Sequence, residues 1–406
     1  MSEFQSRVLD SHIPPQQQRI KTFSLNHHTD SSLFQPNQFN KWIRCALESP
    51  VEEIDVNVDL ATATEMATAT AMQVPLSVFT SENLRILKLQ GEATLYSLYF
   101  PPCLPSLKVL SLKMPHRDAT DLVSMLLLTS CCPVLEEFYF DGFCRTMRIT
   151  AAPKLKKLVV NIESFESTAA VFEIDAPSLE YFSLKDMDPE RYVVRDLGKV
   201  VEAEFSIMLD QRKSKACLFN LLQGLSSVKF LHINICYHDS LLPDSSTYLS
   251  TSRDYLPEFP NLIRLHFDGT SNLDLLPFFL RNSPKLETLI IETHSLIKDC
   301  LSSSLTNFTY KGLQGKEEEF ERVKYISRNS SVLKTLKIQP DLSFKKKPRK
   351  ERLRVSKELS MLPRGSQSCQ FVFDQKSFFS GKGLQNVWVR TVKEKRWSKE
   401  IGYYGQ

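Results

Sequence analysis

Apolar residues recur along this chain in one short phrase: an apolar residue, two variable residues, a second apolar residue, one variable residue and a third apolar residue. Leu84, Leu87 and Leu89 form one clear copy. Copies of the phrase begin at residues 20, 51, 84, 107, 135, 155, 179, 200, 228, 262, 286, 305 and 333. From residue 84 onward, successive copies start 19 to 34 residues apart, which indicates an internal repeat.

The alternation within the phrase predicts a short β-strand with apolar side chains on one face and the variable residues on the other. A period of roughly 20–29 residues is that of leucine-rich repeats. The consensus Asn is missing and the spacing varies, so we predict an α/β fold, an irregular leucine-rich-repeat solenoid with a curved parallel sheet. The predicted strands include residues 86–89, 109–112, 137–140, 157–160, 181–184, 230–233, 264–267, 288–291 and 335–338.

The segments between phrases carry signals of helices and loops. Apolar stripes predict helices at 121–128 and 216–222, and a third helix at 275–280 would hold Pro277 near its first turn. The low-complexity run 61–72 and the polar run 239–256 are typical of exposed loops.

The two faces of the predicted sheet have different roles. On the inner face, full burial is expected for Leu110, Leu158, Leu231, Leu265 and Leu289. The variable positions form a ladder, and such a ladder is the usual binding face of a solenoid. The predicted partner-binding residues are Glu137, Tyr139, Asp141, Lys157, Asn161, Tyr181, Lys185, Glu202, Glu204, Phe230, His232, Asn234, Arg264, His266 and Asp268. The alternative is that the aromatic rings pack on cross-strand neighbours and bind nothing.

Composition narrows the class of protein. The 51 basic and 47 acidic residues give a net charge of +4, which does not predict a nucleic-acid partner. Nine cysteines without a CxxC pair indicate free thiols in a reducing compartment. The chain has no run of about 18 apolar residues for a membrane span and its start lacks signal-peptide features, so we expect a cytoplasmic or nuclear protein. The basic run 345–350 is either a nuclear import signal or a solvated loop between two strands.

No catalytic motif is found: HExxH, GxSxG, a Walker loop and GxGxxG are all missing. Asp186, Asp188 and Glu190 lack the spacing of a calcium loop and are interpreted as solvated turn carboxylates. We therefore predict no catalytic residue, no metal site and no cofactor, and a protein that is not an enzyme. An enzyme with a site built from scattered residues is the weaker alternative.

Particular segments carry a family resemblance. Residues 74–89 resemble a segment of plant F-box/leucine-rich-repeat proteins, and the run from Cys300 through Tyr310-Lys311-Gly312 to Cys369-Gln370 and Phe373 resembles an FBD domain. The resemblance covers about residues 4–373. It predicts an N-terminal segment 1–19, a repeat array 20–295, an FBD-like domain 296–373 and an unassigned tail 374–406. In that family an F-box docks a Skp-type adaptor, and the repeats select targets for a cullin-based ubiquitin ligase.

The resemblance leaves two functions open. Residues 1–19 contain no recognisable F-box, and Pro14-Pro15 interrupts any longer helix there. The chain is then either a target-recognition module, with an adaptor and cullin as partners only if a longer form supplies the F-box, or a free-standing scaffold or decoy. We expect this form not to capture a Skp-type adaptor on its own. Its target protein is not readable from the sequence.

Overall fold

A long parallel sheet organises this computed structural model. The structure describes residues 20–29, 36–60, 72–91, 93–94, 102–118, 123, 131–149, 152–162, 170–186, 189–209, 215–237, 257–268, 275–292 and 304–373. The expectations for residues 1–19, 61–71, 239–256 and 374–406 therefore lie outside the described residues.

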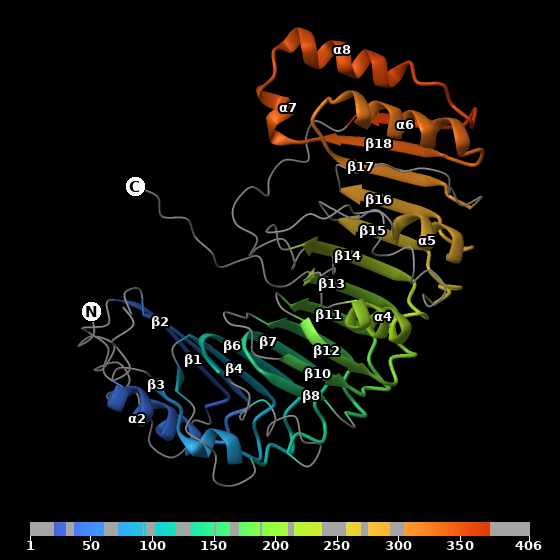
Figure 1. The fold of residues 1–406 in the computed structure, drawn as a ribbon. Coiled ribbons are helices and arrows are strands. Elements are labelled where there is room, and N and C mark those ends of the chain that lie inside the picture. Colours follow the sequence, from blue (N-terminus) through green and yellow to red (C-terminus); the bar gives the residue numbers. More distant parts are fainter. Residues whose placement is uncertain are drawn as a thin grey trace.

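In the part of the chain that the structure describes, fourteen strands pair in chain order, and five short strands lie outside this sheet. Figure 1 shows the sheet curving as an arc from the N-terminal to the C-terminal repeats. All of the strands predicted from the phrase are confirmed, in a parallel arrangement. The strands are β1 (Thr22–Thr29), β2 (Glu53–Leu60), β4 (Ile86–Gly91), β6 (Val109–Asp118), β7 (Glu137–Phe143), β9 (Lys157–Ile162), β11 (Tyr181–Asp186), β13 (Glu202–Leu209), β14 (Phe230–Tyr237), β15 (Arg264–Asp268), β16 (Thr288–Glu292), β17 (Asn307–Leu313), β18 (Thr335–Pro340) and β19 (Gln370–Phe373).

A four-residue turn introduces most of these strands. The amide of Leu107 donates to the carbonyl of Leu104 at 3.2 Å, and Pro105 holds the second position of that turn. Proline suits this position because its φ is already set and it has no amide to satisfy. Equivalent bonds run from Leu135 to Cys132, Leu155 to Ala152, Leu179 to Ala176, Leu262 to Phe259 and Leu286 to Ser283.

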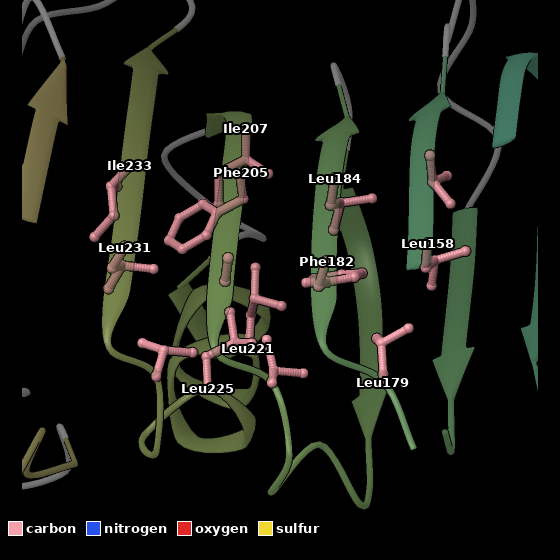
Figure 2. Packing of buried hydrophobic residues seen from close by; sticks show 14 of the residues in the cluster. Leu158, Leu179, Phe182, Leu184, Phe205, Ile207, Leu221, Leu225, Leu231 and Ile233 are labelled. Atoms are coloured by element: carbon pink, nitrogen blue, oxygen red, sulfur yellow. The ribbon is translucent and has the colours of Figure 1, made fainter. Parts of the chain in front are cut away.

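The core lies between the sheet and an outer layer. Leu110, Leu158, Leu265 and Leu289 are 0% exposed and Leu231 is 2% exposed, which confirms the predicted inner face. Figure 2 shows Leu158, Phe182 and Leu231 lying in a row across neighbouring strands, with Leu221 and Leu225 packed on the same side. Each strand therefore buries the apolar edge of the next one.

Helices form part of the outer layer. The predicted helices at 216–222 and 275–280 are confirmed as α4 (Lys215–Gly224) and α5 (Leu275–Asn282). The helix expected at 121–128 lies outside the described residues apart from residue 123. Within the described residues, the other helices before the C-terminal region that have stated bounds are α2 (Pro36–Leu47) and the short 3-10 helix η2 (Leu76–Thr80).

A second sheet, which the phrase did not predict, lies on the outer side of the arc (Figure 1). It consists of β8 (Thr146–Ile149), β10 (Ala170–Ile174) and β12 (Pro189–Val194), all parallel. A two-stranded pair joins β3 (Met72–Gln73) to β5 (Ala93–Thr94). Along the chain, β8, β10 and β12 each lie between two successive strands of the long sheet, in segments where no strand was predicted.

The C-terminal region continues the long sheet. β17 leads to α6 (Glu317–Asn329), and β18 leads to α7 (Leu342–Lys346) and α8 (Arg349–Ser360) before β19 closes the array. The interpretation of 345–350 as a loop between two strands is wrong, because these residues span the end of α7 and the start of α8. Pro348 precedes the first residue of α8, where a missing amide is tolerated.

Candidate functional site

The variable positions of the phrase form three rows on the face of the sheet opposite the core. The strands pair in one parallel register, so equivalent positions stand side by side on neighbouring strands. We call this surface, from β7 to β15, the strand face. The first row holds Glu137, Lys157, Tyr181, Glu202, Phe230 and Arg264; the second holds Tyr139, Val159, Ser183, Glu204, His232 and His266; the third holds Asp141, Asn161, Lys185, Ser206, Asn234 and Asp268.

All of the side chains that the sequence assigned to a binding face are placed in these rows, and each is partly or fully exposed. Beyond the assigned set, the rows contain Val159, Ser183 and Ser206. The surface is therefore continuous from strand to strand and mixes aromatic, charged and amide groups. Such a mixture matches the centre and rim of protein interfaces, where aromatic residues and arginine are enriched.

A lysine between two tyrosines marks the middle of the strand face. Nζ of Lys157 lies 5.2 Å from the ring centroid of Tyr139 and 5.5 Å from that of Tyr181. The Tyr139 hydroxyl donates to Glu137 at 2.5 Å, and the Tyr181 hydroxyl donates to Glu204 at 3.0 Å. Burial and the Glu204 charge raise the pKa of Tyr181, so its hydroxyl stays protonated. Cation–π contacts thus fix both rings in part-exposed positions.

Two histidines extend this network toward the C-terminal repeats. The rings of His232 and His266 stack with centroids 3.9 Å apart, and Nδ1 of His232 lies 3.2 Å from Oε1 of Glu204. Nε2 of His266 lies 3.2 Å from Nζ of Lys311 and 3.7 Å from Oε2 of Glu292.

Burial and side-chain contacts determine the protonation states of His266 and Glu292. Burial lowers the pKa of His266 to about 4, so its ring is neutral at neutral pH. The contact with His266, together with the neighbouring Lys311 ammonium, lowers the pKa of Glu292 to about 2. Near pH 7 the pair of imidazoles is thus flanked by a carboxylate and an ammonium that themselves pair at 3.1 Å.

The remaining assigned residues make shorter-range contacts. The Asn161 amide donates to Asp141 at 2.5 Å, and Lys113 lies 4.0 Å from the same carboxylate. The Arg264 guanidinium lies 5.2 Å from the ring centroid of Phe230. Cross-strand packing of the rings, which the sequence left as an alternative, is therefore present, and it leaves the rings part exposed.

Sequence reasoning missed members of the same rows on other strands. Glu292 of β16 pairs in register with Asp268, and Lys311 of β17 pairs with Glu292. On β2 and β4, Lys88 bonds Glu53 at 3.3 Å and lies 3.5 Å from Asp55. The signal was available, because Glu53, Asp55 and Lys88 occupy variable positions of the copies that begin at 51 and 84, and Glu292 and Lys311 directly follow the copies that begin at 286 and 305.

Asp186 corrects one interpretation made from the sequence. It is 0% exposed and accepts a hydrogen bond of 2.8 Å from the hydroxyl of Tyr192 in β12, so it is not a solvated turn carboxylate. This bond ties the long sheet to the outer sheet. Asp188 lies outside the described residues.

The described part of the chain contains neither a candidate metal site nor a candidate membrane-spanning helix. No group of three or more His, Cys, Asp or Glu side chains there could hold a metal ion. Among the helices of these residues, none is long and apolar enough to cross a membrane.

Comparisons with known proteins agree on one family. Residues 295–338 match the model of the FBD family, and residues 39–204 match the model described as FBD-associated F-box protein At5g56370, LRR repeats. Among relatives from Arabidopsis thaliana, F-box/LRR-repeat protein 13 is 30% identical over 382 residues, covering 87% of this chain and 80% of the relative. F-box/FBD/LRR-repeat protein At1g78750 is 29% identical over 357 residues, covering 82% and 74%.

Proposed function

The chain belongs to the plant F-box/FBD/leucine-rich-repeat family, and on that premise we propose that it is a recognition module that binds a target protein through the strand face. The observation that carries the proposal is the alignment of Tyr139, Lys157, Tyr181, Glu204 and their neighbours in continuous rows across consecutive strands. Cross-strand contacts hold these side chains in place before a partner arrives. Binding therefore requires little ordering of the surface.

The charges of the strand face favour a protein partner of mixed character. Lys157, Lys185 and Arg264 share the rows with Glu137, Glu202, Glu204, Asp141 and Asp268, so both signs are present and the carboxylates are in excess. A nucleic acid would be met by a concentrated basic face. The family consists of F-box/LRR proteins, and we infer binding rather than catalysis for this chain. We also place it in the cytoplasm or nucleus, which its free thiols support.

Affinity purification with mass spectrometry tests target binding. A strand-face variant, Lys157→Glu, Lys185→Glu and Arg264→Glu, is compared with the wild-type chain. The control reverses the same number of positive charges, Lys154→Glu, Lys199→Glu and Lys285→Glu, at lysines that are exposed at the third position of three equivalent turns. We expect a target captured by the wild type and the control to be lost from the strand-face variant. Equal capture by all three would contradict the proposal.

Coupling to a ubiquitin ligase is a separate part of the proposal. We propose that targets bound by the strand face are delivered to a cullin-based ligase when an F-box joins the module to a Skp-type adaptor. The alternative is a scaffold or decoy that binds the same targets without a ligase. A pull-down of the 406-residue chain with purified adaptor tests the scaffold alternative: stoichiometric capture would contradict it, and an F-box found in a longer transcript would support delivery to a ligase.

A further inference from the structure

The C-terminal end of the array exposes apolar side chains that cover nothing in the described structure. Leu342 of α7 is 55% exposed, Leu353 of α8 is 60% exposed, and Met361, which follows α8, is 71% exposed. Among the large apolar residues of the described part, these three are the most exposed. Leu353 and Met361 lie on or directly after α8, so this helix carries the most exposed large apolar side chains of the described part.

Cations surround these apolar side chains. Val355 and Leu359 fix α8 to the body, and both are buried. The opposite side of the helix exposes Arg349, Lys350, Arg354 and Lys357. These positions lie three or four residues apart, so they share one face of the helix with Leu353. We call Arg349, Lys350, Leu353, Arg354, Lys357 and Met361 the α8 face.

Few carboxylates neutralise this face. Residues 346–357 hold seven Lys and Arg residues against the single carboxylate of Glu351. Lys347 pairs with Glu351 at 2.7 Å, and Arg354 pairs with Glu358 at 3.2 Å. Within the described residues, Arg349, Lys350 and Lys357 have no carboxylate partner. The positive charge is therefore directed at solvent.

The fold determines the conformation of the basic run 345–350. An import receptor takes an extended cationic segment, which was one interpretation of 345–350. Residues 349–350 instead form the first turn of α8. The cations thus belong to a preformed helical surface with fixed spacing.

We propose that the α8 face docks an acidic segment of a partner protein, one that carries carboxylates together with aliphatic side chains. The carboxylates would meet Lys350, Arg354 and Lys357, and the aliphatic groups would cover Leu353 and Met361. The face offers no aromatic ring on which nucleic-acid bases could stack. Its apolar side chains are interspersed with charges, whereas a membrane-surface helix has a continuous apolar face. Figure 1 places α8 at the end of the arc opposite β1, away from the centre of the strand face.

Fluorescence anisotropy tests this proposal with the full chain. The probe is a labelled peptide of Glu-Glu-Leu repeats, and its neutral counterpart carries Gln for Glu. We expect the acidic peptide to bind, the neutral one to bind about tenfold more weakly, and added salt to weaken the acidic complex. The variant Lys350→Glu, Arg354→Glu, Lys357→Glu should lose about tenfold in affinity. The variant Leu353→Ser, Met361→Ser should also bind more weakly.

The control for charge is again Lys154→Glu, Lys199→Glu, Lys285→Glu, which should bind like the wild type. Circular dichroism and thermal unfolding establish that each variant is folded, as the exposure of the changed residues predicts. Equal affinity of wild type and the α8 variants overturns the proposal, as does no binding of the acidic peptide. Duplex DNA and phosphatidylserine vesicles serve as the remaining probes. Tighter, α8-dependent binding of either one also overturns it. Failure here leaves the strand-face experiment untouched, because the two sites share no residue.

Discussion

Leu158 and Lys157 are neighbours in β9 with opposite environments. Leu158 is 0% exposed among the core side chains, whereas Lys157 lies part exposed between two rings. The alternation of a strand produces this difference from one residue to the next. A one-residue error in the register would exchange the two environments, so a pair of substitutions tests the assignment directly.

We predict that Leu158→Ala lowers the free energy of unfolding by about 2–5 kcal/mol, because it removes buried methyl groups and leaves a cavity. Lys157→Ala should lower it by about 1 kcal/mol or less, since only part-exposed cation–π contacts are lost. Urea unfolding of both variants measures the difference. Similar losses at the two positions would show that the faces are misassigned.

His266 makes stability depend on pH. Burial lowers its pKa from 6.5 to about 4, so between these values the unfolded chain binds a proton that the folded chain does not. The free energy of unfolding should therefore fall as pH falls through this window, by up to about 1.4 kcal/mol per pH unit.

The variant His266→Gln removes this contribution. We predict a smaller loss of stability for the variant than for the wild type between pH 7 and pH 5, measured by urea unfolding at each pH. Over most of this window Glu292, whose ordinary pKa is 4.5, is ionised in both the folded and the unfolded chain, so it contributes little to the change. Parallel pH profiles for the two proteins would mean that His266 does not carry the effect.

Among the elements, α6 depends on one buried carboxylate. Glu319 is 1% exposed and accepts hydrogen bonds from the backbone amides of Gln314, Gly315 and Lys316, at distances from 2.7 to 3.1 Å. These amides belong to the turn between β17 and α6. The carboxylate thus joins the helix to the strand that precedes it, in the way a capping box does.

We predict that Glu319→Ala lowers the free energy of unfolding by about 1–3 kcal/mol, because buried amides lose their acceptor. Glu317→Ala, an exposed change in the same helical turn, should cost about 0.5 kcal/mol. Hydrogen exchange should show faster exchange in residues 314–320 of the Glu319 variant. Unchanged exchange there would contradict the assigned role.

The elements also show how far the sequence reaches. The phrase predicted the strands of the long sheet except β19, because burial on one face imposes a strict alternation. It did not predict β8, β10 and β12, which lie along the chain between successive strands of the long sheet and whose pairing depends on neighbouring repeats. Asp186 was misinterpreted for a related reason. A carboxylate in a turn-like sequence is expected in solvent, and its burial beside Tyr192 exists only once the second sheet forms.

At the scale of the whole molecule, one register connects all of these observations. Parallel pairing from β1 to β19 brings equivalent positions into rows, so most members of the strand face, though not Val159 or Ser206, were assigned from the sequence alone. The contacts between the side chains of the strand face could not be predicted from the sequence. The stacking of His232 on His266 and the position of Lys157 between two rings depend on rotamers and on the distance between strands. The α8 face could not be predicted either, because the sequence indicated neither a helix at Arg349–Ser360 nor its place at the end of the array.

The central claim is that the strand face contacts the target, and site-specific photo-crosslinking tests it most directly. A photoreactive residue replaces Ser183, which is part exposed at the centre of the face on β11, or Arg148, whose side chain is 64% exposed on the outer sheet. The account predicts that a target found by affinity purification crosslinks to position 183 and not to position 148. Crosslinking at 148 alone would contradict the account.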